Sequence, residues 1–437
     1  MGSSRSGLRI AAAALLLPAA LMAQAERPGV RLEEAIVMAE RVQPSMVQAR
    51  TSINNAMARQ RVTKGAFLPS LSFSTNGNTS FSEGSSRVDQ ASGQVISGDT
   101  RTTSFGGSIS TGIDLFTGFR RGADRRAADA QYQAAEASLT NVTYQQKLTT
   151  TNQFYDVVAA EQLLGVRQAS LVRAQEQFNV AVTRLRAGAG TTSDSLRSVV
   201  TMGQARLAVI TTETQLASAE ANLGRLIGRE GRVRAIADSS LWTVLPDIDT
   251  TGLRVEALNN APSVQVATAN LDAANASLKA AKAAYFPSLS LSASNSFNAN
   301  GRNDYQIFQS RSVGVSLSWS IFNRFSREQS IQTQLSSLEN SEASQAEARR
   351  QVLANLTVRL AELFAARTRI EITTASVAAA NEDLRVSQER YRLGLATIVE
   401  LLQSQEALNQ ADVDAVNARF DYLRAKAQIE ALIGRNL

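Results

Sequence analysis

The sequence predicts an α+β membrane protein built as a tandem internal repeat, with a β-hairpin and a long helix in each copy. Three observations support this fold class. Landmarks recur at constant offsets in the two halves of the chain, segments near residues 70 and 290 alternate Ser with apolar residues, and two segments of about 65 residues lack Pro. Alternation with a period of two is typical of strands, whereas long segments without Pro that are rich in Ala, Gln and Leu favour helix.

The first 25 residues are predicted to be a secretory signal peptide. Arg5 and Arg9 precede an apolar segment from Ile10 to Met22, and the small residues that end at Ala25 fit a cleavage site. This segment is too short to span a membrane as a helix, and no later segment reaches the roughly 18 apolar residues that such a helix requires. We therefore expect an exported protein whose strands make any membrane insertion.

The composition excludes several classes of function. The chain of 437 residues has no Cys and no His, which removes disulfides, zinc-thiolate sites and a His-based hydrolase triad. The formal net charge is +6, and the basic residues are interspersed with acidic ones, which favours solvated helix faces over nucleic-acid binding. An enzyme built on carboxylates and Lys stays formally open, although no cluster of such residues indicates one.

Two copies of one unit make up the chain after the leader. Pro69 and Pro287 lie 218 residues apart, whereas later landmarks keep an offset of 206: "DLFTGFR" matches "SIFNRFS", "RLRAGAG" matches "RYRLGLA", and "RLIGR" matches "ALIGR". The difference of 12 residues places a longer loop in the first hairpin. We expect the copies at residues 26–229 and 252–437, joined by a linker at residues 230–251.

Each copy is predicted to contain one hairpin, at about residues 69–116 and 287–322. In both hairpins apolar residues alternate with Ser, Thr, Asn or Gly. Strands of a membrane barrel turn such an apolar face to lipid and a small polar face to a water-filled lumen. The predicted lipid-facing residues are Leu71, Phe73, Phe105, Ile109, Ile113, Leu289, Leu291, Val313, Val315, Leu317 and Trp319.

Four strands in one chain are too few to close a channel, so the membrane interpretation requires an oligomer. Backbone groups in lipid must all be paired, and among sheets only a closed barrel pairs every strand. Three chains would supply 12 strands around a shared lumen. The sequence therefore predicts an oligomer with four strands per chain.

Helices are expected for most of the remaining chain. The long helix of each copy would measure on the order of 100 Å at 1.5 Å per residue. Stripes of Val, Leu and Phe along the helices indicate packing seams. The predicted helices are residues 32–42, 45–66, 121–186, 193–228, 253–260, 263–285, 327–392 and 398–434.

The chain resembles the TolC-like outer-membrane efflux family, the outer membrane factors. The resemblance rests on the leader, the tandem repeat, the strand entries "FLPSLS" and "YFPSLS", and the segment "RYRLGLATIVELLQSQEALNQA". It covers essentially the whole mature chain. It implies a homotrimer in the cell outer membrane, whose 12-stranded barrel continues as a long α-helical barrel through the periplasm, with no catalytic residue, cofactor or metal.

The resemblance also implies a function and partners. The protein would be the exit duct of a tripartite efflux pump or a type I secretion system, conducting drugs, metals or polypeptides passively to the exterior. Its partners would be a periplasmic adaptor (membrane fusion) protein, an inner-membrane pump of the RND, ABC or MFS type, and outer-membrane lipid, with no nucleic acid. The adaptor contacts implied at the hairpin tips are Leu185, Ala187, Gly188, Leu393, Gly394 and Leu395.

A gate at the periplasmic end is implied as well. Tyr391 stands where the family has a Tyr that is tied to an acid in the closed state, and Asp194 stands where that acid lies. Glu400 occupies the position of a ring of carboxylates. Three such carboxylates near the channel axis would concentrate negative potential and favour cations.

The sequence departs from the family pattern at two gate positions. Ala396 stands where an Arg would join the closing network, and Gln403 stands where a second ring of acids would lie. The sequence leaves two alternatives open. The gate uses Arg390 or Arg392 instead, or it closes less tightly than in the family pattern.

An exported helical filament or appendage subunit without channel activity is the alternative from a different class. Long helices, the absence of Cys and richness in Ala, Gln, Ser and Thr suit such a protein. It does not explain a continuous apolar row in both hairpins. Membrane fractionation with SDS gels of unheated and heated samples separates the two, because a trimeric barrel requires detergent and a filament pellets without it.

Overall fold

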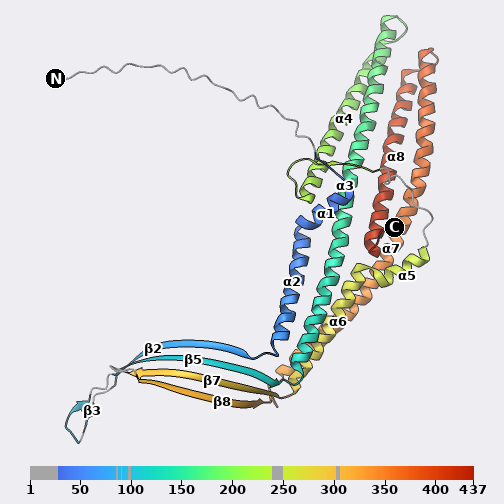
Figure 1. Cartoon of the computed structure of the whole chain (residues 1–437). Helices are drawn as coiled ribbons and strands as arrows, with labels where there is room; N and C mark the ends of the chain where they lie inside the picture. Colours follow the sequence, from blue (N-terminus) through green and yellow to red (C-terminus); the bar gives the residue numbers. More distant parts are fainter. Residues whose placement is uncertain (1–27, 85–86, 90, 97–99, 239–249, 302–305) are drawn as a thin grey trace, which may run out of the picture.

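The computed structural model describes residues 28–84, 87–89, 91–96, 100–238, 250–301 and 306–437. Long helices form most of the molecule, and a sheet projects from one end of them (Figure 1). The predicted signal peptide and the middle of the linker lie outside the described residues. No helix in the described part of the chain is long and apolar enough to cross a membrane.

The two hairpins form one antiparallel sheet with the strand order β2-β5-β7-β8. These strands are β2 (Ser70–Ser82), β5 (Thr100–Phe116), β7 (Ser288–Gly301) and β8 (Gln306–Ser318). Within the longer loop of the first copy, β3 (Arg87–Val88) pairs with β4 (Val95–Ile96). The sheet joins the two copies through β5 and β7, so β2 and β8 are its edges.

The register separates the sheet into an apolar face and a hydroxyl face. Phe73 pairs with Ile109, and Leu291 pairs with Val315. Side chains of residues that pair directly across strands lie on the same face. The opposite face carries hydroxyl pairs with O···O distances of 2.7 to 2.8 Å, namely Ser72 with Ser110, Ser74 with Ser108, and Ser294 with Ser312.

The predicted end of the second hairpin is wrong for the single chain. Strand β8 ends at Ser318, so Trp319 lies beyond the strand. The indole Nε1 of Trp319 donates a hydrogen bond to the carbonyl oxygen of Tyr285 at 3.2 Å. In the first copy, β5 continues through the equivalent residues because β7 pairs with it there, as at Ile113. Within one chain, β8 is an edge strand and has no such neighbour.

The helices of the two copies follow the same order. The helices of the first copy are α1 (Leu32–Val42), α2 (Pro44–Gly65), α3 (Arg120–Arg186) and α4 (Thr192–Ile227). Those of the second copy are α5 (Thr250–Asn260), α6 (Pro262–Lys282), α7 (Ser326–Arg392) and α8 (Ile398–Ile433). A short parallel pair, β1 (Gly29–Val30) with β6 (Arg234–Ala235), attaches the linker near the start of the first copy.

The return helices begin and end with the same chemistry in both copies. Thr191 and Thr397 precede α4 and α8, and the hydroxyl of each accepts a hydrogen bond from the backbone N–H three residues later. Gly228 and Gly434 end these helices with φ of 75° and 76°. Glycine adopts this left-handed conformation without steric cost, so each helix stops where its glycine stands.

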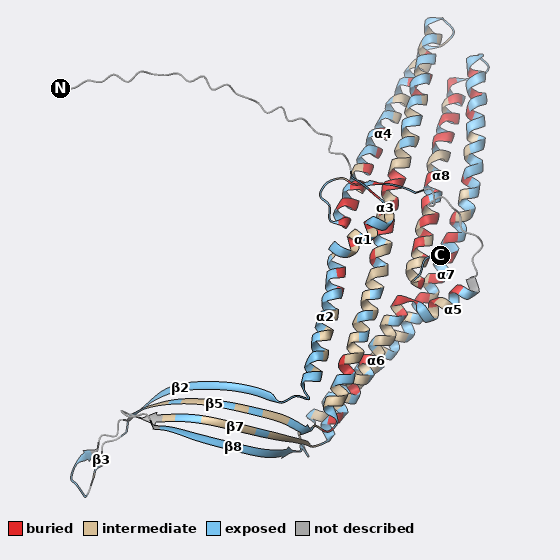
Figure 2. Ribbon diagram, viewed as in Figure 1, coloured by how far each residue is buried: buried red, intermediate tan, exposed pale blue. Residues whose placement is uncertain are grey.

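The main core lies midway along the helices, around α3, α4, α7 and α8 (Figure 2). Its fully buried residues include Phe154, Leu223, Leu356, Phe420 and Ile429. The sheet has no comparable core, because most of its residues are exposed or half-buried. The middle of the molecule is therefore stabilised within one chain, whereas the sheet depends on other surroundings.

Tyr155 provides an alkaline test of this core. Burial raises the pKa of the Tyr155 phenol to about 12, and the charge of Glu430 adds to the shift. An unfolded Tyr ionises near pH 10. The contribution of the neutral Tyr155 phenol to the free energy of unfolding is therefore intact below that pH and is lost as the pH rises toward 12. Between pH 10 and pH 12 the wild type should therefore lose about 2–3 kcal/mol of its free energy of unfolding through this group, and Tyr155→Phe should not show that loss. Denaturant midpoints across this pH range measure the difference. An unchanged pH profile in the variant would contradict this assignment.

Candidate functional site

The predicted adaptor contacts lie at two helix turns, at the end of the molecule farthest from the sheet (Figure 1). Tip 1 joins α3 to α4, and tip 2 joins α7 to α8. Gly188 and Gly394 have φ of 71° and 78°, which glycine tolerates better than other residues do. Leu393 and Leu395 are 68% and 67% exposed, whereas Leu185 is half-buried. Tip 2 therefore presents the larger apolar surface.

Arg184 connects tip 1 to tip 2. Its guanidinium carbon lies 4.6 Å from the centre of the Tyr391 ring, and its Nη1 donates a hydrogen bond to the Tyr391 carbonyl oxygen. Its Nη2 donates to the carbonyl oxygen of Ala189 at 3.3 Å, which fixes the side chain at tip 1. Arg184 was not predicted from the sequence, although the repeat aligns it with Arg390, a predicted gate residue.

Tyr391 and Asp194 lie close enough to interact electrostatically. Tyr391 is 4% exposed. Burial raises the pKa of its phenol, the Asp194 carboxylate raises it further, and Arg184 lowers it. The Asp194 carboxylate accepts a hydrogen bond from the backbone N–H of Thr191 at 3.2 Å. Within the described chain, no hydrogen bond joins Asp194 to the Tyr391 hydroxyl, so the implied tie is not formed in a single chain.

The remaining predicted gate residues pair within tip 2 or face solvent. Arg390 Nη2 lies 3.9 Å from Glu400 Oε2, and Arg392 Nη2 lies 3.2 Å from Glu389 Oε2. The Glu400 side chain is 48% exposed, and Gln403 is exposed. Among the described residues, neither Arg390 nor Arg392 forms an ion pair with tip 1. Glu400 thus keeps an accessible carboxylate that a distant Arg neutralises only in part.

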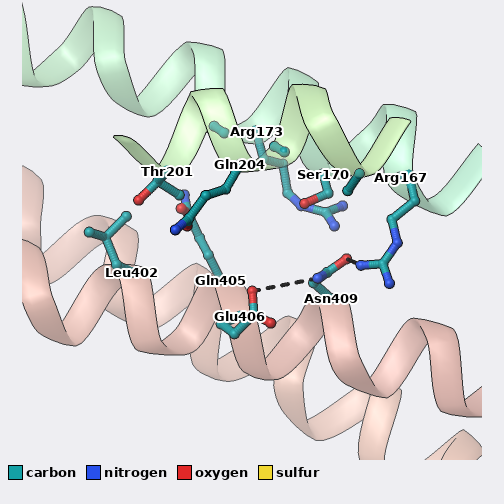
Figure 3. Close-up of a pocket in the computed structure, with 12 residues that line it drawn as sticks. Arg167, Ser170, Arg173, Thr201, Gln204, Leu402, Gln405, Glu406 and Asn409 are labelled. Atoms are coloured by element: carbon teal, nitrogen blue, oxygen red, sulfur yellow. Dashed lines mark hydrogen bonds between the residues drawn. The ribbon is translucent and has the colours of Figure 1, made fainter. Parts of the chain in front are cut away.

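A polar cavity of about 400 Å³ lies between α3, α4 and α8, on the sheet side of the tips (Figure 3). Arg167 Nη1 donates a hydrogen bond to Asn409 Oδ1 at 2.9 Å. Arg173 Nη2 lies 3.7 Å from Asp412 Oδ2. Burial raises the pKa of the Asp412 carboxyl, and the charge of Arg173 opposes this shift. No sequence motif marked these residues, and the contact between the two copies is loosely packed here.

The apolar face of the sheet is the second candidate surface. The exposed fraction is 77% for Leu71 and Val313, 73% for Phe73 and 69% for Leu317. Soluble monomers rarely expose continuous apolar patches of more than a few hundred Å². The predicted lipid-facing residues before Trp319 therefore form one surface that requires lipid or another protein to cover it.

Comparison with known proteins finds relatives over most of the chain. The family model described as outer membrane efflux protein matches residues 35–229 and 253–435. Protein CyaE of Bordetella pertussis is 27% identical over 295 residues, which cover 67% of this chain and 62% of that protein. The pyoverdine export outer membrane protein OpmQ of Pseudomonas aeruginosa is 26% identical over 340 residues, which cover 76% of this chain and 70% of that protein.

A solved structure shows the same fold. The open state of the MtrE outer membrane channel of Neisseria gonorrhoeae has a TM-score of 0.75 at 19% sequence identity. The match covers 93% of this chain and 89% of that chain. The family match confirms the resemblance to TolC-like proteins, including the outer-membrane location with a large periplasmic part. The chain belongs to the outer membrane efflux protein family.

Proposed function

We propose that three copies of the chain form a channel through the outer membrane, which serves as the exit duct of a tripartite efflux pump or a type I secretion system. The observation that carries this proposal is a sheet with one apolar face and two open edges, β2 and β8. Unpaired backbone groups are too costly to remain exposed to lipid. Pairing of β8 with β2 of the partner subunit removes both edges, and three chains of four strands close a barrel of 12.

The internal repeat predicts the register between chains. Strand β8 aligns with β5 at an offset of 206, and β7 aligns with β2 at an offset of 218. Within the chain, Ser110 of β5 pairs with Ser294 of β7. The equivalent pair between chains is Ser316 of β8 with Asn76 of the partner subunit. Both residues belong to the hydroxyl face, so the proposed lumen stays polar along the new seam.

The same register accounts for the short β8. It places Trp319 opposite Phe73 of the partner subunit, as Ile113 lies opposite Leu291 within the chain. Pairing across the seam would extend β8 beyond Ser318. Trp319 would then join the lipid-facing row that the sequence predicts.

The helical end is proposed to dock onto a periplasmic adaptor, which connects it to an inner-membrane pump of the RND, ABC or MFS type. The exposed Leu393 and Leu395 of tip 2 would supply apolar contacts to the adaptor. The proposed lumen face of the sheet consists largely of Ser, Thr, Asn and Gly, which suits passage of varied cargo. We therefore assign cargo selection to the pump and passive conduction to this chain.

Glu400 is proposed to form a cation-binding ring at the narrow end. We expect Glu400→Ala to weaken block by a trivalent cation at least tenfold, because three half-exposed carboxylates act on one ion. Titration of the conductance in planar bilayers measures the block. Glu389→Ala is the matched control, since Glu389 pairs with Arg392 one turn before tip 2. Equal block in wild type and Glu400→Ala would remove Glu400 from the channel axis.

Single-channel recording of the purified protein in planar bilayers tests the proposed function as a whole. We expect discrete conductance steps together with a band that shifts on SDS gels when the sample is heated. A protein that pellets without detergent and gives no conductance would instead support the filament alternative.

A further inference from the structure

The junctions between sheet and helices carry two exposed Phe residues on a strained backbone. Gly118 and Phe119 have φ of 61° and 66°, and Arg324 and Phe325 have φ of 57° and 62°. Residues other than Gly are rarely left-handed, and such conformations persist only where their surroundings stabilise them. Phe119 and Phe325 are nevertheless 70% and 68% exposed, so contacts within the chain cover only part of each ring.

Each of these residues packs against another aromatic ring, and Phe119 also meets Phe286 edge to face at 5.8 Å. Phe119 meets Phe116 edge to face with ring centroids 5.4 Å apart, and Phe325 meets Phe322 in the same way at 5.5 Å. The repeat thus preserves both the unusual backbone and the pair of rings. Aromatic rings are stabilised at the boundary between hydrocarbon and lipid headgroups. That boundary explains why exposed rings are kept here.

Basic side chains gather at the same level from four helices. The last turns of α2 and α6 and the first turns of α3 and α7 meet at the base of the sheet (Figure 1). Exposed basic residues in and beside these turns form no ion pair with any residue that the structure describes. We call them the basic collar: Arg61, Lys64, Arg126, Lys279, Lys282 and Arg324.

The collar concentrates charge that appears dispersed along the sequence. Screening in physiological salt acts over about 8 Å, and charges gathered on adjacent helix ends therefore act together on an anionic surface. Each Lys or Arg close to such a surface strengthens the attraction about fivefold.

We propose that the junction binds anionic phospholipid of the periplasmic leaflet, with headgroup phosphates at the basic collar and acyl chains against the Phe116–Phe119 and Phe322–Phe325 pairs. This inference rests on the proposed channel function, which places the junction at the periplasmic surface of the outer membrane. Phospholipid is the occupant that satisfies both features, because it offers an anionic headgroup and hydrocarbon at adjacent depths.

Titration of the full-length protein in neutral detergent with fluorescent phosphatidylglycerol and phosphatidylcholine tests the proposal. We expect wild type to prefer phosphatidylglycerol, and Arg126→Gln combined with Arg324→Gln to reduce that preference about 25-fold. Binding of phosphatidylcholine should change little. NaCl at about 1 M, where the screening length is about 3 Å, should weaken the preference in wild type.

The matched control removes two exposed charges far from the junction. Arg206 and Arg349 lie on α4 and α7 and form no ion pair with the described part of the chain. The double change of both to Gln should leave the preference intact. Equal binding of the two lipids by wild type, or an equal loss of preference in the control, would overturn the proposal.

Conductance separates this proposal from the channel proposal. Variants of Arg126 and Arg324 should form trimers that conduct like wild type, because neither residue is assigned to the lumen or the gate. Loss of lipid preference with normal conductance supports the collar as a lipid site. A wild type that shows no lipid preference but conducts refutes the collar alone, whereas absence of conductance in wild type refutes the channel.

Discussion

Replacing Arg184 by Ala is expected to raise the open probability of the channel at least tenfold. Arg184 is the side chain that joins tip 1 to tip 2, through the Tyr391 ring and its carbonyl oxygen. A cation–π contact and a charge-assisted hydrogen bond together contribute about 2–4 kcal/mol. Their loss should favour separation of the tips. Planar-bilayer recording and uptake of a large antibiotic by whole cells measure the effect.

Two variants control this prediction. Arg390→Ala removes the repeat equivalent of Arg184, whose ion pair stays within tip 2 at 3.9 Å, so a smaller change is expected. Tyr391→Phe keeps the ring and the carbonyl oxygen that Arg184 contacts, and should gate like wild type. Equal open probabilities in Arg184→Ala and wild type would show that this contact does not hold the gate.

Placing a charge on the apolar face of the sheet should abolish assembly. Val313 is 77% exposed in the single chain and lies on the proposed lipid face. An Arg in the middle of a membrane costs about 2–4 kcal/mol in each chain, and the trimer contains three copies. We expect Val313→Arg to remove most of the heat-modifiable trimer, measured on SDS gels of outer membranes.

The neighbouring residue provides the matched control. Ser312 lies on the opposite face, where its hydroxyl is 2.8 Å from that of Ser294. Ser312→Arg should still assemble and should reduce conductance, because its side chain would enter the lumen. Assembly of both variants, or of neither, would contradict the division of the sheet into a lipid face and a lumen face.

The features that local sequence patterns determine were predicted well. Helices α3 and α7 begin one residue before the predicted positions and end at Arg186 and Arg392. The absence of Pro within a helix and the presence of Gly in the turn after it specify such bounds, because both act through a few neighbouring residues. The alternating parity of the strands likewise assigns Leu71 and Val313 to one face, since side chains of a strand point to alternate faces.

Features that depend on contacts across the fold were not predicted. Arg184 is unremarkable in the sequence and becomes important only because α7 brings Tyr391 beside it. The basic collar emerges because four helix ends meet, although its residues are dispersed along the chain. The end of β8 at Ser318 differs from the prediction because the neighbour that would extend this strand belongs to another chain.

Disulfide trapping tests most directly whether the open edges of the sheet close against each other between chains. The chain has no Cys, so Ser316→Cys combined with Asn76→Cys introduces the only thiols. Residues directly opposite in antiparallel strands lie about 4.5–5.5 Å apart between Cα atoms, within disulfide range. The control combines Ser316→Cys with Asn78→Cys, a diagonal pair about 7–8 Å apart.

After oxidation in membranes, non-reducing SDS gels should show covalent dimers and trimers for the Ser316–Asn76 pair, and reduction should return them to monomers. The control pair should remain mostly monomeric. Monomers alone for the Ser316–Asn76 pair, or equal cross-linking of the two pairs, would contradict the shared barrel and the register that the repeat predicts.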